Sequence, residues 1–560
     1  MNSNSNNNYT QQDLYDAYAA NNEGRNEVDR ILHVLTHLTF HNAAWGRNQP
    51  DPDFNDDTPL HTTCDRGAWP IAQWLLFNSR ADVNLPNRRR GDTPVLLASE
   101  NGHVSTVKFL VEEHHADVNI QNNDGDTPLH VASNNNHLDI VKFLLEDGCA
   151  DVNVVNNLGF SPLELAVRND YLEIVKFFVE KGYADASALD NNYGDTLLHK
   201  ASWWSSLDVA KFLVKECHIY ADLPNTRRET PLHRAGRARG ANAVIFLVKE
   251  AHADTNLPDN LGNTPLHETS LLGSMYITEF LVKEGQADVN IRNNEGNTPL
   301  LMASKQKKWW IVQFLVEEGG AEANIPNNDG NTPLHMATMY GHEDAVRFLV
   351  EEGHADANAS NNEGDTPLHM ASKIFWGFNV AKFLVDEARA EAFIPNKNGD
   401  TPFHTASQHG NVDNAKLLSE LNGADVNVTN NDGNTALVLA SENGHLSTVQ
   451  FLIEDGGADA HIPNNNGSTA LLFASKNGHL DLVKLLVEEV HAKVKSPNNE
   501  GDTPLHMASK NGHLDIVKFL VERAEADAKA TNSDGNTPLG LASENGHSNT
   551  IRYLVQHALL

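Results

Sequence analysis

One pattern of about 34 residues recurs along almost the whole chain. Each copy begins with a Thr-Pro-Leu-like triplet, and successive copies start 34 residues apart, or 35 at three steps. The fifteen starting residues are Thr58, Thr93, Thr127, Ser161, Thr196, Thr230, Thr264, Thr298, Thr332, Thr366, Thr401, Thr435, Thr469, Thr503 and Thr537. A fixed period of this length predicts a stack of similar small units rather than one compact core.

The copy that begins at Thr503 predicts a short helix. The Thr503 hydroxyl can cap the helix start, and Pro504 suits the first helical position, where no amide donor is needed. Leu505 and Ala508 then share one face at helical spacing. Gly512 closes the segment, because glycine adopts the left-handed conformation that ends many helices.

A second helix follows in the same copy. Asp515, Lys518 and Glu522 form one polar stripe, and apolar residues fill the rest of the circumference. A helix that is apolar on most of its surface must be covered on more than one side, which neighbouring copies can provide. Between copies, dipeptides such as Asp124-Gly125 have the chemistry of a hairpin turn.

The segments "TPLHMAS", "NGHLDIV" and "GADVN" resemble the ankyrin repeat. The period here is slightly longer than the family's usual unit of about 33 residues. The resemblance implies an all-α fold, an α-solenoid of stacked helix-turn-helix repeats joined by β-hairpin loops, over residues 50–560. It also implies that the array binds other proteins. We expect residues 1–24, which are rich in Asn, to be a disordered tail, and residues 25–49 to hold a capping helix.

Composition excludes several classes of function. The formal net charge of −33 disfavours nucleic acid and anionic membranes as partners. No stretch approaches the roughly 18 apolar residues of a membrane helix, and the N-terminus lacks a signal peptide. Three cysteines are too few for a disulfide framework, so we expect a reducing compartment, the cytoplasm or the nucleus.

The 28 histidines are predicted to be structural. Nine occupy the fourth position of the Thr-Pro-Leu-His segment, and seven more follow the turn between the two helices. They recur once per repeat, whereas a metal site needs three or four ligands that converge. The Asn-Asp-Gly turns lack the full oxygen ligand set of a calcium loop. We therefore expect no enzyme activity, no metal and no cofactor.

Differences among the copies point to candidate binding residues. Several copies at both ends of the array close the first helix with pairs such as Lys510-Asn511, whereas the middle copies do not. In the ankyrin family these positions line the concave face, so the resemblance implies partner contacts there. The candidates at these positions or near them are Trp203, Trp204, Arg237, Leu271, Leu272, Trp310, Met339, Tyr340, Ile374, Phe375 and Trp376. Tryptophan, tyrosine, methionine and arginine commonly anchor protein interfaces.

Packing against a neighbouring repeat is the alternative for these side chains. We expect core packing for Trp309, which stands where other copies have Leu, and exposure for Trp203, Trp204 and Trp310. The hairpin that holds Arg88, Arg89 and Arg90 and a cluster of arginines in the sixth copy could hold an acidic peptide or phosphate, but pairing with nearby carboxylates is favoured for both. The second cluster is the larger. Its arginines are Arg227, Arg228, Arg234, Arg237 and Arg239. Since Gly236 interrupts its first helix, we also expect this copy to be the least stable.

These observations predict a monomeric scaffold or adaptor that binds partner proteins on the concave groove of the solenoid. The partners would offer basic or apolar segments, because the chain is acidic and its candidate residues are largely apolar. The alternative is a structural spacer without a dedicated binding patch, in which the tryptophans are shielded from solvent. An enzyme or metal-dependent protein is a third, disfavoured hypothesis.

Overall fold

The computed structural model describes residues 58–79, 81–190 and 193–557. The tail predicted at residues 1–24 and the capping helix predicted at residues 25–49 lie outside the described residues. The chain divides into two compact units, Met1–Asn260 and Leu261–Leu560, and each unit is described by itself below.

The first unit contains six helix pairs within its described residues. Its first helices are α3 (Pro59–Asp65), α5 (Pro94–Glu100), α7 (Pro128–Asn134), α9 (Pro162–Arg168), α11 (Leu197–Trp204) and α13 (Pro231–Arg237). Its second helices are α4 (Trp69–Ser79), α6 (Val104–Lys108) with its π-helical continuation η2 (Phe109–Glu113), α8 (Leu138–Glu146), α10 (Leu172–Glu180), α12 (Leu207–Lys215) and α14 (Ala241–Lys249).

The second unit contains nine helix pairs within its described residues. Its first helices are α15 (Pro265–Leu272), α17 (Pro299–Ser304), α19 (Pro333–Met339), α21 (Pro367–Lys373), α23 (Pro402–Gln408), α25 (Ala436–Glu442), α27 (Ala470–Asn477), α29 (Pro504–Lys510) and α31 (Pro538–Glu544). Its second helices are α16 (Met275–Lys283), α18 (Trp309–Glu317), α20 (Glu343–Glu351), α22 (Phe378–Asp386), α24 (Val412–Ser419), α26 (Leu446–Glu454), α28 (Leu480–Glu488), α30 (Leu514–Glu522) and α32 (Ser548–His557).

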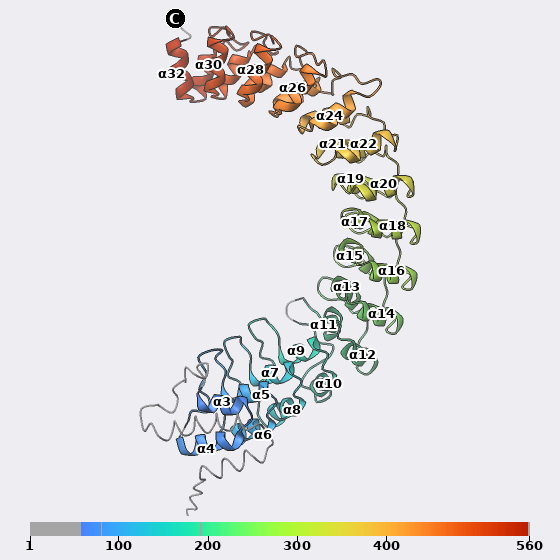
Figure 1. Ribbon diagram of the computed structural model, residues 1–560, viewed down its shortest axis with the longest axis vertical. Helices are drawn as coiled ribbons and strands as arrows, with labels where there is room; N and C mark the ends of the chain where they lie inside the picture. The colour runs from blue at the N-terminus through green and yellow to red at the C-terminus, as the bar shows by residue number, and fades with distance from the viewer. Residues whose placement is uncertain (1–57, 80, 191–192, 558–560) are drawn as a thin grey trace, which may run out of the picture. The chain divides into compact units, whose positions relative to one another are not determined.

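Within each unit the helices form two layers. First helices pack against the first helices of adjacent repeats, and second helices do the same in the other layer (Figure 1). Between the layers lies the core, where Leu505, Ala508, Val517 and Leu520 of one repeat are completely buried. The predicted all-α solenoid is confirmed. Across the described residues the connecting loops contain no β-strand; they are tight turns, as where the Gly125 amide donates to the Asn122 carbonyl over 2.9 Å.

The nine histidines of the Thr-Pro-Leu-His segments are completely buried. Each ring has two roles: one nitrogen caps its own helix, and the other bonds to the next repeat. In α7, the Thr127 amide donates to Nδ1 of His130 over 3.1 Å. The other ring nitrogen, Nε2, donates to the Phe160 carbonyl of the next repeat over 3.0 Å. The same arrangement recurs between Nε2 of His335 and the Asp365 carbonyl over 3.0 Å. The prediction that these histidines are structural is confirmed.

The seven histidines that follow the turn between helices join repeats in the opposite direction. Nε2 of His513 donates to the Lys476 carbonyl of the preceding repeat over 2.9 Å, and Nε2 of His137 donates to the Glu100 carbonyl over 3.0 Å. Asparagines add a further ladder: Nδ2 of Asn464 donates to Oδ1 of Asn434 over 2.9 Å. Each repeat is therefore hydrogen-bonded to its neighbours on both sides within a unit.

The buried histidines predict a pH dependence. Burial lowers the pKa of His130, His335 and His369 below the ordinary value of 6.5, because Nδ1 must remain an acceptor and no water reaches the ring. In the unfolded chain these rings take up protons near pH 6.5, whereas in the folded chain they do not. The free energy of unfolding should therefore be highest above pH 6.5 and fall as the pH drops below it, by up to ~1.4 kcal/mol per pH unit for each histidine.

Urea unfolding at about pH 7.5 and about pH 5.5 measures this change. A His130→Leu variant is the matched control, because Leu96 and Leu301 occupy the same position in other repeats. Between the two pH values, the free energy of unfolding of the variant should fall by less than that of the unaltered chain, and the difference is the contribution of one histidine. An unfolding midpoint that does not move between the two pH values would contradict the assignment.

Candidate functional site

The predicted binding residues fall into both units. The first unit holds Trp203, Trp204 and Arg237. The second unit holds Leu271, Leu272, Trp310, Met339, Tyr340, Ile374, Phe375 and Trp376. The two groups are therefore two separate candidate surfaces.

Trp203 and Trp204 are the last two residues of α11 and have different surroundings. Trp203 is 40% exposed, with the Arg234 guanidinium carbon 5.9 Å from its ring centroid. Trp204 is half-buried and meets the Phe160 ring edge-on, with centroids 5.7 Å apart. The guanidinium carbon of Arg168 lies 5.7 Å from the same Phe160 ring. Trp203 thus faces solvent, whereas Trp204 packs partly on the preceding repeat.

A second stack of arginine and aromatic rings begins at Tyr193, in the hairpin before α11. The Arg227 guanidinium carbon lies 4.5 Å from the Tyr193 ring centroid, and that of Arg234 lies 5.5 Å from it. Trp203 and Trp204 are consecutive residues at the end of α11, and each of the two stacks includes one of them. We call the combined set the arginine–aromatic row; its members are Arg168, Phe160, Trp204, Trp203, Arg234, Tyr193 and Arg227.

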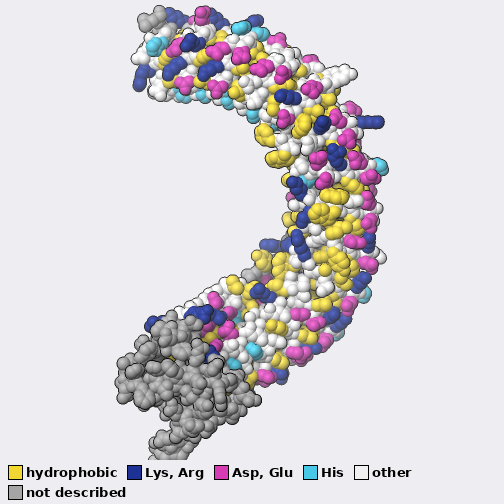
Figure 2. Space-filling model, in the orientation of Figure 1, with side chains coloured by type: hydrophobic (Ala, Val, Ile, Leu, Met, Phe, Trp, Pro, Cys, Tyr) yellow, Lys and Arg dark blue, Asp and Glu magenta, His cyan; other side chains and the backbone are white. Residues whose placement is uncertain are grey.

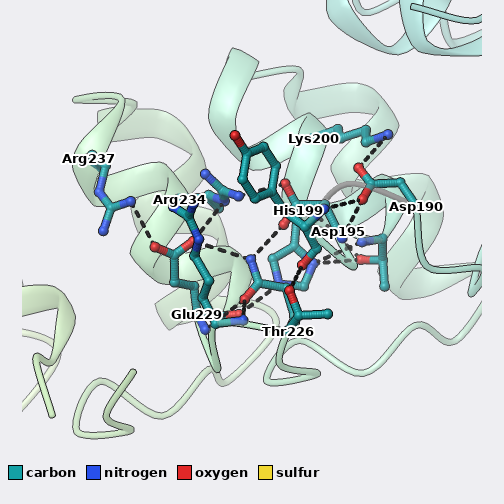
Figure 3. A network of polar contacts seen from close by, with 12 residues as sticks. Asp190, Asp195, His199, Lys200, Thr226, Glu229, Arg234 and Arg237 are labelled. Atoms are coloured by element: carbon teal, nitrogen blue, oxygen red, sulfur yellow. Dashed lines mark hydrogen bonds and ion pairs between the residues drawn. The ribbon is translucent and has the colours of Figure 1, made fainter. Parts of the chain in front are cut away.

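Two arginines of the sixth repeat take part in a buried ion-pair network (Figure 3). Arg234 pairs with Glu229 over 3.2 Å and with Asp195 of the preceding repeat over 2.8 Å. Arg237 pairs with the other oxygen of Glu229 over 2.8 Å. The Glu229 side chain is only 3% exposed. The favoured interpretation, that these arginines pair with nearby carboxylates, is confirmed for Arg234 and Arg237.

Electrostatics hold Glu229 in its charged form. Burial alone would raise the pKa of this carboxyl, but the guanidinium groups of Arg237 and Arg234 outweigh burial and keep the pKa below its ordinary value. Asn225 adds a hydrogen bond to each acid: its Nδ2 lies 2.7 Å from Oδ1 of Asp195 and 3.2 Å from Oε2 of Glu229. The network fixes the end of α13 and the hairpin before it.

In the second unit, a shallow groove of about 500 Å³ lies between hairpins and first helices. Glu295 and Asp329 line it from the hairpins, Lys305 lines it from the residue that follows α17, and Met336 and Met339 line it from α19. We call this the Met339 groove. Its walls offer carboxylates, amides and two thioether side chains. Figure 2 shows hydrophobic side chains gathered over the middle of this unit, from α15 to α20, whereas charged side chains intermingle over α28 to α32.

Other predicted residues lie near the ends of the first helices in this unit. Met339 is half-buried, and Tyr340 is 47% exposed and stacks on the His342 ring at 6.1 Å. Leu271 and Leu272 are half-buried at the end of α15. The ammonium group of Lys308 donates to the Leu272 carbonyl over 2.8 Å, which replaces the inter-repeat histidine bond of other repeats.

The tenth repeat carries one extra residue at the end of its first helix. Ile374 is half-buried, whereas Phe375 is 72% and Trp376 is 68% exposed. Trp376 covers the turn of the preceding repeat so closely that a Cβ atom on Gly341 would lie 2.5 Å from its ring. In other repeats a histidine ring covers this glycine, so Trp376 takes over that inter-repeat contact.

Trp309 and Trp310 begin α18, a second helix, and do not line the Met339 groove. Trp310 is 41% exposed and occupies the register position of Asp515 in the polar stripe. Trp309 is 38% exposed, so the expectation of core packing was wrong. The first position of the second helix lies at the rim of the core: Leu446 and Phe378 are each 36% exposed there.

Sequence reasoning missed Phe160, Tyr193 and Arg168 as members of the surface in the first unit. The signal was present at the residue that precedes the hairpin glycine, which we call the tip position. Most repeats of the second unit have an acid or Asn at the tip position, as at Asp329. In three consecutive repeats of the first unit, the tip position is Leu158, Tyr193 and Arg227. In the last of these repeats, Arg228 replaces the hairpin glycine.

A metal site would require converging ligands in the described part of the chain, and a membrane span would require a long apolar helix. There, no group of three His, Cys, Asp or Glu side chains is placed to hold a metal ion. Over the same residues, every helix is too short or too polar to span a lipid bilayer. The three cysteines, all within the described ranges, are free thiols.

The buried network predicts a stability effect for Glu229→Gln. The amide cannot neutralise Arg234 and Arg237, so the local free energy of unfolding of α13 and α14 should fall by roughly 2–3 kcal/mol. Hydrogen exchange of the amides in these helices measures this change. In the unaltered chain the same experiment tests whether the sixth repeat is the least protected.

Glu363→Gln is the control, because it removes the same charge from an exposed tip position. It should leave exchange in its own repeat within about 0.5 kcal/mol of the unaltered protein. Equal effects of the two substitutions would contradict a specific role for the network.

Comparison with known proteins agrees with this architecture. A family model described as ankyrin repeats in three copies matches residues 17–122, 60–156, 95–190, 149–226, 232–327, 310–392, 354–430, 374–464, 417–498, 456–532 and 490–559. Over 125 residues the chain is 34% identical to Alpha-latrotoxin-Lm1a from Latrodectus mactans. That match covers 18% of this chain and 59% of the relative, so it spans less than two thirds of the relative's length.

The family matches cover well over half of the chain, and they agree with the helix pairs, the capping histidines and the hairpin turns. Ankyrin repeats imply binding to other proteins. This chain belongs to the ankyrin repeat family.

Proposed function

We propose that the chain is a non-enzymatic scaffold that binds partner proteins with the first helices and hairpins of its repeats. The Met339 groove is the observation that carries this proposal. It combines apolar contact area from the half-buried Met339 with two carboxylates, Glu295 and Asp329, on a surface whose backbone is fixed by inter-repeat hydrogen bonds. A preorganised surface loses little entropy on binding.

The chemistry of the Met339 groove favours a partner segment with apolar and basic side chains. Methionine adapts to varied apolar partners because its side chain is unbranched and polarisable. Glu295 and Asp329 can each accept hydrogen bonds from a lysine or arginine. Tyr340 offers further area beside the groove with a hydroxyl that can hydrogen-bond.

A spacer without a binding patch remains the alternative. Exposure of Trp203, Trp310 and Phe375 favours the scaffold, because a spacer gains nothing from large apolar side chains in solvent. We further propose that the chain acts as a monomer in a reducing compartment, the cytoplasm or the nucleus. Its three free thiols and net charge of −33 support that location and a protein rather than a nucleic acid partner.

The double variant Met339→Ala, Tyr340→Ala tests the proposal. Proteins captured from a cell extract on the intact chain would be identified, purified and titrated against both forms. Binding should weaken at least tenfold, because exposed aromatic and methionine anchors at a groove supply much of the affinity of such interfaces. Thermal unfolding should be nearly unchanged, since neither side chain is buried.

Lys510→Ala, Asn511→Ala is the matched control, at the same register position in the same unit. It should leave the affinity of these partners unchanged. If every captured partner binds the Met339 variant as tightly as the intact chain, the groove is not the site. If no purified protein binds at all, the spacer explanation is correct.

A further inference from the structure

The arginine–aromatic row of the first unit and the adjacent Arg228 carry charges that the fold does not use. Arg168, Arg227 and Arg228 are exposed, and none forms an ion pair with a carboxylate among the described residues. Exposed arginines usually find an acidic neighbour in a chain with 75 Asp and Glu against 42 Lys and Arg. Their positive charge therefore stands out locally.

The neighbouring arginines show what the fold does require. Arg234 pairs with Asp195 and Glu229, and Arg237 pairs with Glu229, so two positive and two negative charges cancel (Figure 3). Removing that pair of acids would leave buried charges, so their role is structural. Among the residues that the structure describes, no acid forms an ion pair with Arg227 or Arg228, so their positive charge lies unpaired at the surface.

Stacking leaves the hydrogen-bonding edge of each guanidinium available. Arg227 lies over the Tyr193 ring at 4.5 Å, and Arg168 lies over the Phe160 ring at 5.7 Å. An aromatic ring attracts a guanidinium to its face, and a planar guanidinium that is covered on one face keeps its in-plane N–H groups for hydrogen bonds. A guanidinium held in this way can donate two parallel hydrogen bonds to one carboxylate.

The backbone around the row is fixed in advance. The Tyr193 carbonyl accepts hydrogen bonds from the Thr226 amide over 2.9 Å and from the Thr226 hydroxyl over 2.6 Å. The Arg227 amide donates to Oδ1 of Asn225 over 2.9 Å. These bonds hold two hairpin tips side by side, so a ligand need not order them. Leu158, at the preceding tip position, is 75% exposed and adds apolar area.

The net charge of −33 does not prevent an acidic ligand from binding here. At physiological ionic strength, charges farther away than about 8 Å are largely screened. The affinity for an acidic ligand then depends mainly on its direct contacts with Arg168, Arg227 and Arg228. A long nucleic acid would place many phosphates near the acidic tips of other repeats, whereas a short peptide segment would not.

We propose that the arginine–aromatic row binds an acidic peptide segment, whose carboxylates pair with Arg168, Arg227 and Arg228 while its apolar atoms cover Trp203 and Tyr193. This proposal rests on the proposed protein-binding function but concerns a different unit and a partner of opposite charge from that of the Met339 groove. The scaffold would thus hold two chemically distinct segments.

A fluorescein-labelled peptide that alternates Glu and Ser tests the proposal by fluorescence anisotropy with the full chain. It should bind, and a Gln–Ser peptide of equal length should not. In the Arg168→Ala, Arg227→Ala variant the affinity should fall roughly tenfold or more, because two charge-assisted contacts are lost. Arg168→Lys, Arg227→Lys keeps the charge but not the planar edge, and it should weaken binding by a smaller factor.

Arg88→Ala, Arg89→Ala is the matched control, since these arginines are exposed on another hairpin tip without an aromatic ring. It should leave the peptide affinity unchanged. The proposal is overturned if this control weakens binding as much as the row variant does, if the Gln–Ser or a single-stranded DNA probe binds equally well, or if no acidic peptide binds. The Met339 variant should bind the peptide normally, so failure here is distinguishable from failure of the proposed function.

Discussion

Hydrogen bonds between neighbouring repeats are the interaction on which each unit depends. A short helix such as α7 begins with buried amide groups that require acceptors, and Nδ1 of His130 supplies one. The same ring requires an acceptor for its second nitrogen, which the Phe160 carbonyl of the next repeat supplies. The same histidine ring therefore caps a helix and joins two repeats. A repeat without its neighbour would leave a buried polar group unsatisfied.

The second histidine contact divides the repeats into two kinds. His103, His137, His445, His479 and His513 bond back to the preceding repeat. The fifth, sixth and seventh repeats have Ser206, Gly240 and Ser274 at this position, and the eighth has Lys308. Most candidate binding residues close the first helices of these or adjoining repeats. The ninth repeat keeps His342, which bonds to the Lys305 carbonyl, and still ends its first helix with Met339 and Tyr340, so the two features vary independently.

Much of this fold could be predicted from the sequence, because the period places residues 34 apart in the same environment. The helix starts at Thr and Pro, the buried face of α29 and α30, and the structural histidines all follow from one repeat and its neighbour. The same register argument could have paired Tyr193 with Arg227, which are 34 residues apart. Sequence alone could not decide which arginine Glu229 would capture. That choice depends on side-chain geometry at the end of α13, where Arg234 and Arg237 reach the acid and Arg227 does not.

The tip position explains how binding chemistry can vary without harm to the stack. Its backbone carbonyl accepts the amide of the next hairpin at Asp124, Tyr193 and Glu295 alike, over 2.9 Å in each case. The side chain takes no part in that bond, so an acid, a tyrosine or an arginine fits equally well. Acidic tips beside the Met339 groove and an arginine beside Tyr193 are therefore compatible with one invariant scaffold. Selection on partners can act at this position while the inter-repeat hydrogen bonds maintain the fold.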